Sequence, residues 1–137
     1  MTTEEHETLS RARVLGREAM DEAVPGIPDL IDASLDTLSP NTARRIYEQI
    51  WGDVYQDERL SMRDRTIATI AGLTAIGGAE TNLNLQTHVA LNIGMEPGEI
   101  VAIVEHSATV AGFPRAQGAL NVLREVFDQR GVVGAGA

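Results

Sequence analysis

The sequence predicts an all-α protein, a bundle of about six to seven helices. Ala- and Leu-rich segments with apolar residues three and four positions apart recur along the 137 residues. This spacing gathers apolar side chains on one face of a helix. Alternating β-branched residues and Asn-Gly turns, which would indicate strands and hairpins, are absent from the sequence.

Three helices are expected in the N-terminal half, at about residues 4–23, 29–38 and 40–55. Pro25 and Gly26 end the first of them, so residues 1–25 form a thinly apolar helical arm. Ser39 stands directly before Pro40, a residue suited to the first turn of a helix, so we expect Ser39 to cap the third helix.

Four helices are expected in the C-terminal half, at about residues 61–76, 81–93, 97–111 and 114–129. Ser61 and Asp64 form a weak capping box at the start of the first of these helices, and Gly77-Gly78 ends it. Nearly every residue from 68 to 76 is apolar or small, so we expect this helix to be central and buried on several sides.

We expect one domain over residues 1–137, because a chain of this length can bury a single core. It consists of the arm, a core over 40–130, and a flexible tail at 131–137 that ends in small residues with little to bury.

Charge and composition exclude several kinds of partner. Asp and Glu number 20 against 11 Lys and Arg, a formal charge of −9 that leaves no basic surface for nucleic acid. The N-terminus has no apolar signal region, and no stretch is long and apolar enough to cross a membrane, so a cytoplasmic protein is expected. Because the chain has no cysteine, disulfides, thiolate metal sites and thiol peroxidase chemistry are excluded.

Three histidines are candidates for proton transfer, since imidazole titrates near neutral pH. His6 lies in the charged arm and is expected to be solvated. His88 and His106 are each either a catalytic acid or base, or a hydrogen-bonded helix residue. His106 is the stronger candidate, because Val110 lies one turn later and Phe113 follows, so this face points toward a corner between helices. No histidine has a metal-binding spacing such as H-E-x-x-H, so neither a metal nor another cofactor is expected.

Four further residues are candidates for ligand contacts. Trp51 and Tyr47 share a helix face and either line an apolar site or belong to the core. Arg65 lies in the first turn of a helix, where the helix dipole does not favour a cation. It therefore has a carboxylate partner, binds an anion, or is simply exposed. Glu48 is either a pocket base or a solvated helix residue, and we favour solvation.

Several short motifs between Trp51 and Phe127 occur together and in order. They are Trp51-Gly-Asp-Val-Tyr55, Leu60 with Arg65, Thr69-Ile-Ala71, Ala90-Leu-Asn-Ile-Gly94, Glu99-Ile100, Ala111-Gly-Phe-Pro114 and Glu125-Val-Phe127. In these motifs the sequence resembles the carboxymuconolactone decarboxylase family, over more than half of the chain and in one register.

The resemblance implies an all-helical subunit, similar to alkylhydroperoxidase D, with its family-like core at 40–130. It implies a homotrimer, or a homohexamer of two trimers, with sites near the subunit contacts. It also implies a cofactor-independent enzyme that acts by acid and base catalysis on a small organic acid or lactone. The related peroxidases use a C-x-x-C pair, which this chain lacks.

Two polar residues of the family pattern are replaced. The family has a histidine eight residues before Gly94, where this chain has Gln86, and a tyrosine where it has Val110. His88 lies about 200° around the helix from Gln86 and cannot substitute for the lost histidine. Gln86, Val110 and Phe113 are still expected to line a substrate site, but we expect carboxymuconolactone itself to be left unchanged.

Two hypotheses about function follow. In the first, the pocket is retained, and His106 acts as acid or base on a different small cyclic or aromatic-derived acid or lactone, as in a lyase, isomerase or cyclase. In the second, the scaffold persists as a ligand-binding or structural oligomer without turnover. A sizeable pocket holding a histidine would favour the first hypothesis, and a corner filled by Trp51, Val110 and Phe113 would favour the second.

Overall fold

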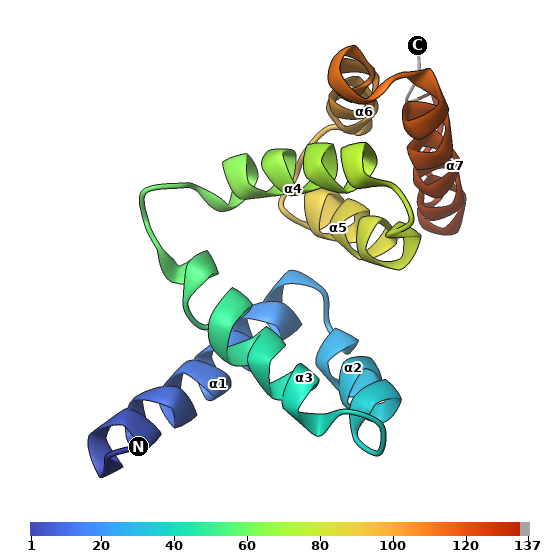
Figure 1. The fold of residues 1–137 in the computed structure, drawn as a ribbon. Coiled ribbons are helices and arrows are strands. Elements are labelled where there is room, and N and C mark those ends of the chain that lie inside the picture. Colours follow the sequence, from blue (N-terminus) through green and yellow to red (C-terminus); the bar gives the residue numbers. More distant parts are fainter. Residues whose placement is uncertain (135–137) are drawn as a thin grey trace. The chain divides into compact units, whose positions relative to one another are not determined.

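The protein is all-α in a computed structural model that describes residues 1–134, and no strand occurs within this range. The elements are α1 (Thr3–Ala23), α2 (Ile27–Leu35), α3 (Pro40–Arg45), the π-helix η1 (Ile46–Trp51), the 3₁₀ helix η2 (Val54–Gln56), α4 (Met62–Ile76), α5 (Glu80–Asn92), α6 (Pro97–Ala111) and α7 (Phe113–Arg130) (Figure 1). The predicted fold class is confirmed.

The elements group into two compact units, Met1–Leu60 (unit 1) and Ser61–Ala137 (unit 2). Unit 1 holds α1 to α3 with η1 and η2, and unit 2 holds α4 to α7. The single domain stays a prediction. The expected tail begins with an ordered turn, because the Val132 amide donates to the Phe127 carbonyl over 2.9 Å. Its last residues, 135–137, lie outside the described residues.

Two glycines bring backbones into contact in unit 1, where α1 packs along η1. A Cβ atom on Gly16 of α1 would overlap the carbonyl oxygen of Tyr47, and one on Gly52 would overlap the carbonyl oxygen of Ala12. Both positions therefore have no room for any side chain.

The helix expected over 40–55 is interrupted, and this is where the prediction was wrong. After α3 the chain forms a π-helix, in which the Gly52 amide donates to the Tyr47 carbonyl five residues earlier over 2.7 Å. Sequence periodicity cannot separate this wider turn from an α-helix, because a single π-turn is too short to establish a spacing of its own.

One of the two expected serine caps forms and the other does not. The Ser61 hydroxyl accepts from the Asp64 amide over 3.1 Å at the start of α4, as predicted. The Ser39 side chain makes no capping bond, because its hydroxyl lies 2.7 Å from the hydroxyl of Thr42 and is used there.

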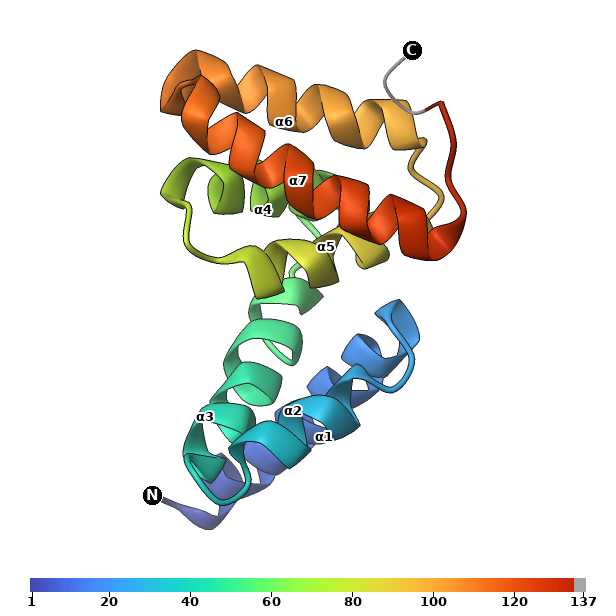
Figure 2. The ribbon, with the colours of Figure 1, turned by 90° about the vertical axis from the view of Figure 1, so that its right-hand side faces the viewer.

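Unit 2 is built around α4, which contacts α5, α6 and α7 (Figure 2). This helix is therefore central, as predicted, but the expected burial on several sides is wrong, because Ala68, Gly72 and Ile76 are exposed. The core between these helices contains an apolar cluster that includes Ile70, Leu83, Ile100, Val104 and Leu123. Short turns with positive φ at Gly77, Gly94 and Gly112 join the helices.

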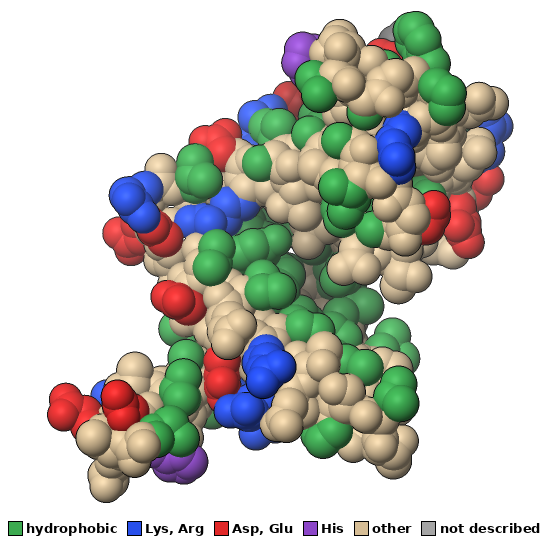
Figure 3. All heavy atoms as spheres, viewed as in Figure 1, with side chains coloured by type: hydrophobic (Ala, Val, Ile, Leu, Met, Phe, Trp, Pro, Cys, Tyr) green, Lys and Arg blue, Asp and Glu red, His purple; other side chains and the backbone are tan. Residues whose placement is uncertain are grey.

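On the face shown in Figure 3, Arg side chains are scattered among Asp and Glu side chains and form no continuous basic strip. Within residues 1–134, no helix combines the length and apolarity needed to cross a membrane.

Candidate functional site

Gln86 is a buried polar residue with an unsatisfied atom. It lies on α5, its exposed fraction is 7%, and it is flanked by the buried Thr87 and Leu83. Among the described residues, the Gln86 Oε1 atom is the buried side-chain oxygen or nitrogen that lacks a hydrogen-bond partner. A buried carbonyl oxygen without a donor costs free energy, so such an atom points to a bound water or ligand that supplies the donor.

Arg65 is buried in unit 2, at the start of α4, with an exposed fraction of 8%. Simple solvent exposure, one of its three explanations, is therefore wrong. Arg65 also has an interaction partner within the protein.

The His88 side chain on α5 contacts Arg130 in the last turn of α7. Its Nδ1 atom lies 3.2 Å from Nη1 of Arg130 and accepts a hydrogen bond, because arginine can only donate. Arg130 also donates to Oδ1 of Asn92 over 2.9 Å. The last turn of α7 is thereby tied to α5. Burial, and then the positive charge of Arg130, lower the pKa of His88.

His88 is expected to make the protein sensitive to acid. Its lowered pKa means that the folded protein resists protonation, so the unfolded chain binds more protons as the pH falls below about 6.5. The folded protein therefore loses stability as the pH falls below about 6.5. Urea midpoints measured at pH 7 and pH 5.5 should differ less in His88→Gln than in the parent protein. His6→Gln, in the exposed arm, serves as the control; an unchanged pH dependence in His88→Gln would contradict this assignment.

The end of α6 and the start of α7 form an exposed corner that carries His106, Val110 and Phe113, here called the α6–α7 corner. His106 is exposed, and the exposed fractions of Val110 and Phe113 are 87% and 80%. A contiguous apolar surface marks a partner or ligand site, and Val110 and Phe113 are candidates for part of one. Val110 and Phe113 therefore do not fill a pocket within the described chain.

Tyr47 and Trp51 lie in the core of unit 1. The Tyr47 hydroxyl lies 2.8 Å from Oδ1 of Asp32 and 3.0 Å from the Pro28 carbonyl, to which it donates. Asp32 is also bound by Arg17 over 3.0 Å. Burial and the bond to Asp32 raise the pKa of Tyr47, so the phenol remains protonated and serves the packing of α2 on η1.

Glu48 is buried, with an exposed fraction of 7%, so the favoured interpretation as a solvated residue is wrong. Its Oε2 atom lies 3.6 Å from Nη1 of Arg44, one turn earlier. The side chain lies on the π-helix η1, a kind of turn that is frequent at functional sites.

A pocket of about 390 Å³ lies in unit 2, where α4 ends and α5 and α7 begin. None of the predicted site residues lines it. Its charged residues, Glu80 and Arg115, were not singled out from the sequence. The signal that could have found them is Gly77-Gly78, since two consecutive glycines leave a stretch of surface without side chains.

Metal-binding clusters were also sought among the described residues. Within residues 1–134, no three His, Asp or Glu side chains gather into a metal-binding cluster.

Comparison with known proteins places most of these residues in one matched segment. The sequence model of the carboxymuconolactone decarboxylase family matches residues 40–125, which is more than half of the chain. A 4-carboxymuconolactone decarboxylase from Acinetobacter baylyi is 25% identical over 122 residues, which cover 89% of this chain and 84% of that protein. Gln86, His106 and the 390 Å³ pocket all lie inside the segment that the family matches.

Proposed function

Since the chain belongs to the carboxymuconolactone decarboxylase family, we propose that it is a cofactor-independent enzyme that transforms a small cyclic or aromatic-derived organic acid or lactone. His106 acts as the acid or base, and Gln86 binds the substrate. The substrate differs from carboxymuconolactone, because an amide stands where the family has a histidine and an amide cannot transfer protons at neutral pH.

The observation that carries the proposal is the unpartnered Oε1 atom of Gln86. A substrate hydroxyl or acid O–H placed against it would satisfy the buried oxygen and so strengthen substrate binding. A buried group left unsatisfied in the free protein requires an explanation, and a bound substrate supplies one.

The α6–α7 corner supports the expected homotrimer or homohexamer. Val110 and Phe113 expose large apolar surfaces beside His106. Burying them against a second subunit would be favourable by about 1.5–3 kcal/mol for each side chain that becomes fully covered. The same contact would move His106 from water into a site at the subunit boundary, where proton transfer to a substrate is protected from solvent.

A second candidate is a ligand-binding oligomer without turnover. It is favoured by one observation, that no histidine lines the 390 Å³ pocket. The exposure of Val110 and Phe113 argues against the version of this hypothesis in which these side chains fill the corner.

The direct test is a turnover screen of the purified protein with small carboxylated lactones and aromatic acids, followed by mass spectrometry. We expect conversion of at least one compound, with 4-carboxymuconolactone left unchanged. Efficient decarboxylation of 4-carboxymuconolactone would refute the inference from Gln86. Saturable binding without conversion of any compound would instead establish the second candidate.

Gln86→Met separates binding from stability. Methionine keeps the unbranched shape and removes the unsatisfied oxygen, so the free energy of unfolding should rise by about 1 kcal/mol. Substrate affinity should fall about tenfold, since the acceptor is lost. The measurements are the thermal midpoint and KM, and Gln117→Met, at an exposed position on α7, is the matched control. A destabilised variant that keeps its KM would show that Gln86 is only structural.

A further inference from the structure

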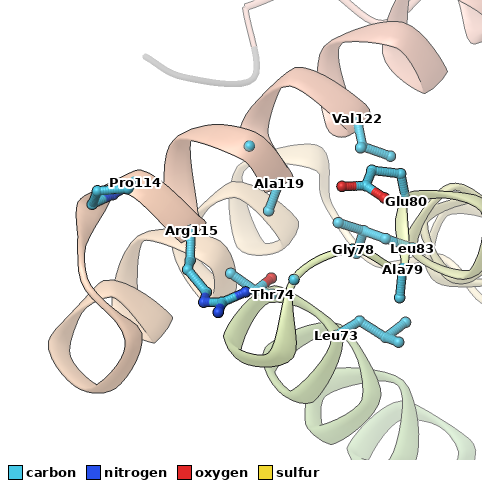
Figure 4. Close-up of a pocket in the computed structure, with 12 residues that line it drawn as sticks. Leu73, Thr74, Gly78, Ala79, Glu80, Leu83, Pro114, Arg115, Ala119 and Val122 are labelled. Carbon is cyan, nitrogen blue, oxygen red and sulfur yellow. The ribbon is translucent and has the colours of Figure 1, made fainter.

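The pocket of about 390 Å³ in unit 2 carries an inference that does not rest on the proposed function, since it shares no residue with the predicted substrate site. The C-terminal end of α4, the turn at Gly77-Gly78, the start of α5 and the first turns of α7 enclose it (Figure 4). Its volume falls within the range of small-molecule pockets, about 300–1,000 Å³.

Glycines keep the pocket open. Gly77 and Gly78 turn the chain with φ of +65° and +71°, and Gly118 faces the pocket from α7. A Cβ atom on Gly118 would meet nothing within 4 Å, so packing does not require a glycine there. A glycine inside a helix costs about 1 kcal/mol relative to alanine. The role that remains for Gly118 is to leave the pocket open on the α7 side.

Opposite charges face the pocket without pairing. Figure 4 shows the Arg115 side chain reaching in from α7 and the Glu80 carboxylate from the start of α5, on opposite sides. Arg115 donates from Nη1 to the carbonyl oxygen of Ile76, which fixes the guanidinium at the end of α4 and leaves its other donors available. Within residues 1–134, neither Arg115 nor Glu80 takes part in a salt bridge.

The wall between the two charges is apolar. Leu73, Leu83 and Val122 line it, and the buried Thr74 hydroxyl is already used, because it donates to the Ile70 carbonyl over 2.8 Å. An apolar group of the ligand would cover this wall, while its polar groups would face Arg115 and Glu80.

We propose that this pocket binds a small zwitterion, an α-amino acid with an apolar side chain. Its carboxylate pairs with Arg115, its ammonium group pairs with Glu80, and its side chain covers Leu83 and Val122. A dianion would be repelled by Glu80 and a simple amine by Arg115, because unpaired like charges at close range are unfavourable. A ligand with both charges satisfies both residues at once.

The test uses l-leucine as the probe, titrated into the full chain and followed by calorimetry and by amide NMR. We expect saturable binding, with shifts of the Gly77, Gly78 and Gly118 amides. Two analogues separate the charges: 4-methylpentanoate lacks the ammonium group and 3-methylbutylamine lacks the carboxylate. Each should bind at least about tenfold more weakly, the loss expected for one charge-assisted hydrogen bond.

Variants assign the two ends of the ligand. Glu80→Gln should weaken leucine binding about tenfold and should not weaken 4-methylpentanoate, which has no ammonium group to pair with Glu80 and is repelled by its charge. Arg115→Gln should weaken both. Gly118→Leu fills the pocket and should abolish binding without unfolding the protein. This variant keeps the test valid if Arg115→Gln, which loses the bond to Ile76, loosens the end of α4. Glu125→Gln and Arg124→Gln, at exposed positions on α7, are the matched controls.

The proposal is overturned by any of three results. They are the absence of saturable leucine binding, equal affinity for leucine and 4-methylpentanoate, and leucine binding that survives Gly118→Leu. Because these measurements report binding at the pocket and not turnover, their failure leaves the proposed enzyme activity untouched, and a failed turnover screen leaves this proposal untouched.

Discussion

His106→Gln is expected to lower turnover of the substrate found in the screen by about 10²–10⁴-fold, the contribution of a positioned general acid or base. Glutamine keeps a polar side chain of similar reach but cannot exchange a proton near neutral pH. Because His106 is exposed on its own subunit, the thermal midpoint and the oligomer mass should stay unchanged. The measurements are kcat, KM and light scattering.

Two histidine variants control this experiment. His6→Gln, in the exposed arm, should leave kcat unchanged. His88→Gln should also leave kcat within a few-fold, since the imidazole of His88 is held by Arg130. Full activity in His106→Gln would contradict its catalytic role, and a loss of folding would make it structural. Loss of activity in His88→Gln alone would move the proton transfer to that residue.

Gly16→Ala is expected to destabilise unit 1 by about 1–3 kcal/mol, the usual cost of overpacking, and the upper end is expected here. The new methyl group would overlap the Tyr47 carbonyl oxygen, and a backbone atom cannot rotate away as a side chain can. Trp51 is the one tryptophan of the chain and is buried in unit 1. Its fluorescence therefore reports the unfolding of this unit, and the urea midpoint should fall.

Gly72→Ala is the matched control, because it makes the same substitution inside α4, where a Cβ atom meets nothing within 4 Å. It should raise stability by about 0.4–1 kcal/mol, since alanine has less freedom to lose on folding. Circular dichroism follows this change in unit 2. A Gly16→Ala protein as stable as the parent would show that α1 moves away from η1 at little cost.

Most of the secondary structure could be predicted from the sequence, because local signals decide it. The helix predicted at 97–111 is found as Pro97–Ala111, bounded by a proline in the first turn and a glycine after the last. Ser61 caps α4 as expected. The family could also be predicted from motifs between Trp51 and Phe127, and the matched segment 40–125 confirms it.

The π-helix and the burial of Glu48 could not be predicted. Both belong to a segment that packs along α1, and Gly16 and Gly52 show how closely these two segments, far apart in the sequence, approach each other. The same holds for Gln86. Its departure from the family pattern is visible in the sequence, but an unsatisfied oxygen exists only once the surrounding chain has excluded water from it.

Residue types and spacings along the chain are enough to predict the all-α class, the helix boundaries in unit 2 and the family, and to exclude cysteine chemistry. The tertiary structure alone decided which polar groups lack partners and which opposite charges face one pocket. Arg115 and Glu80 lie 35 positions apart in the sequence, counted from their numbers, and only the folding of α7 against the turn after α4 brings them to the same cavity.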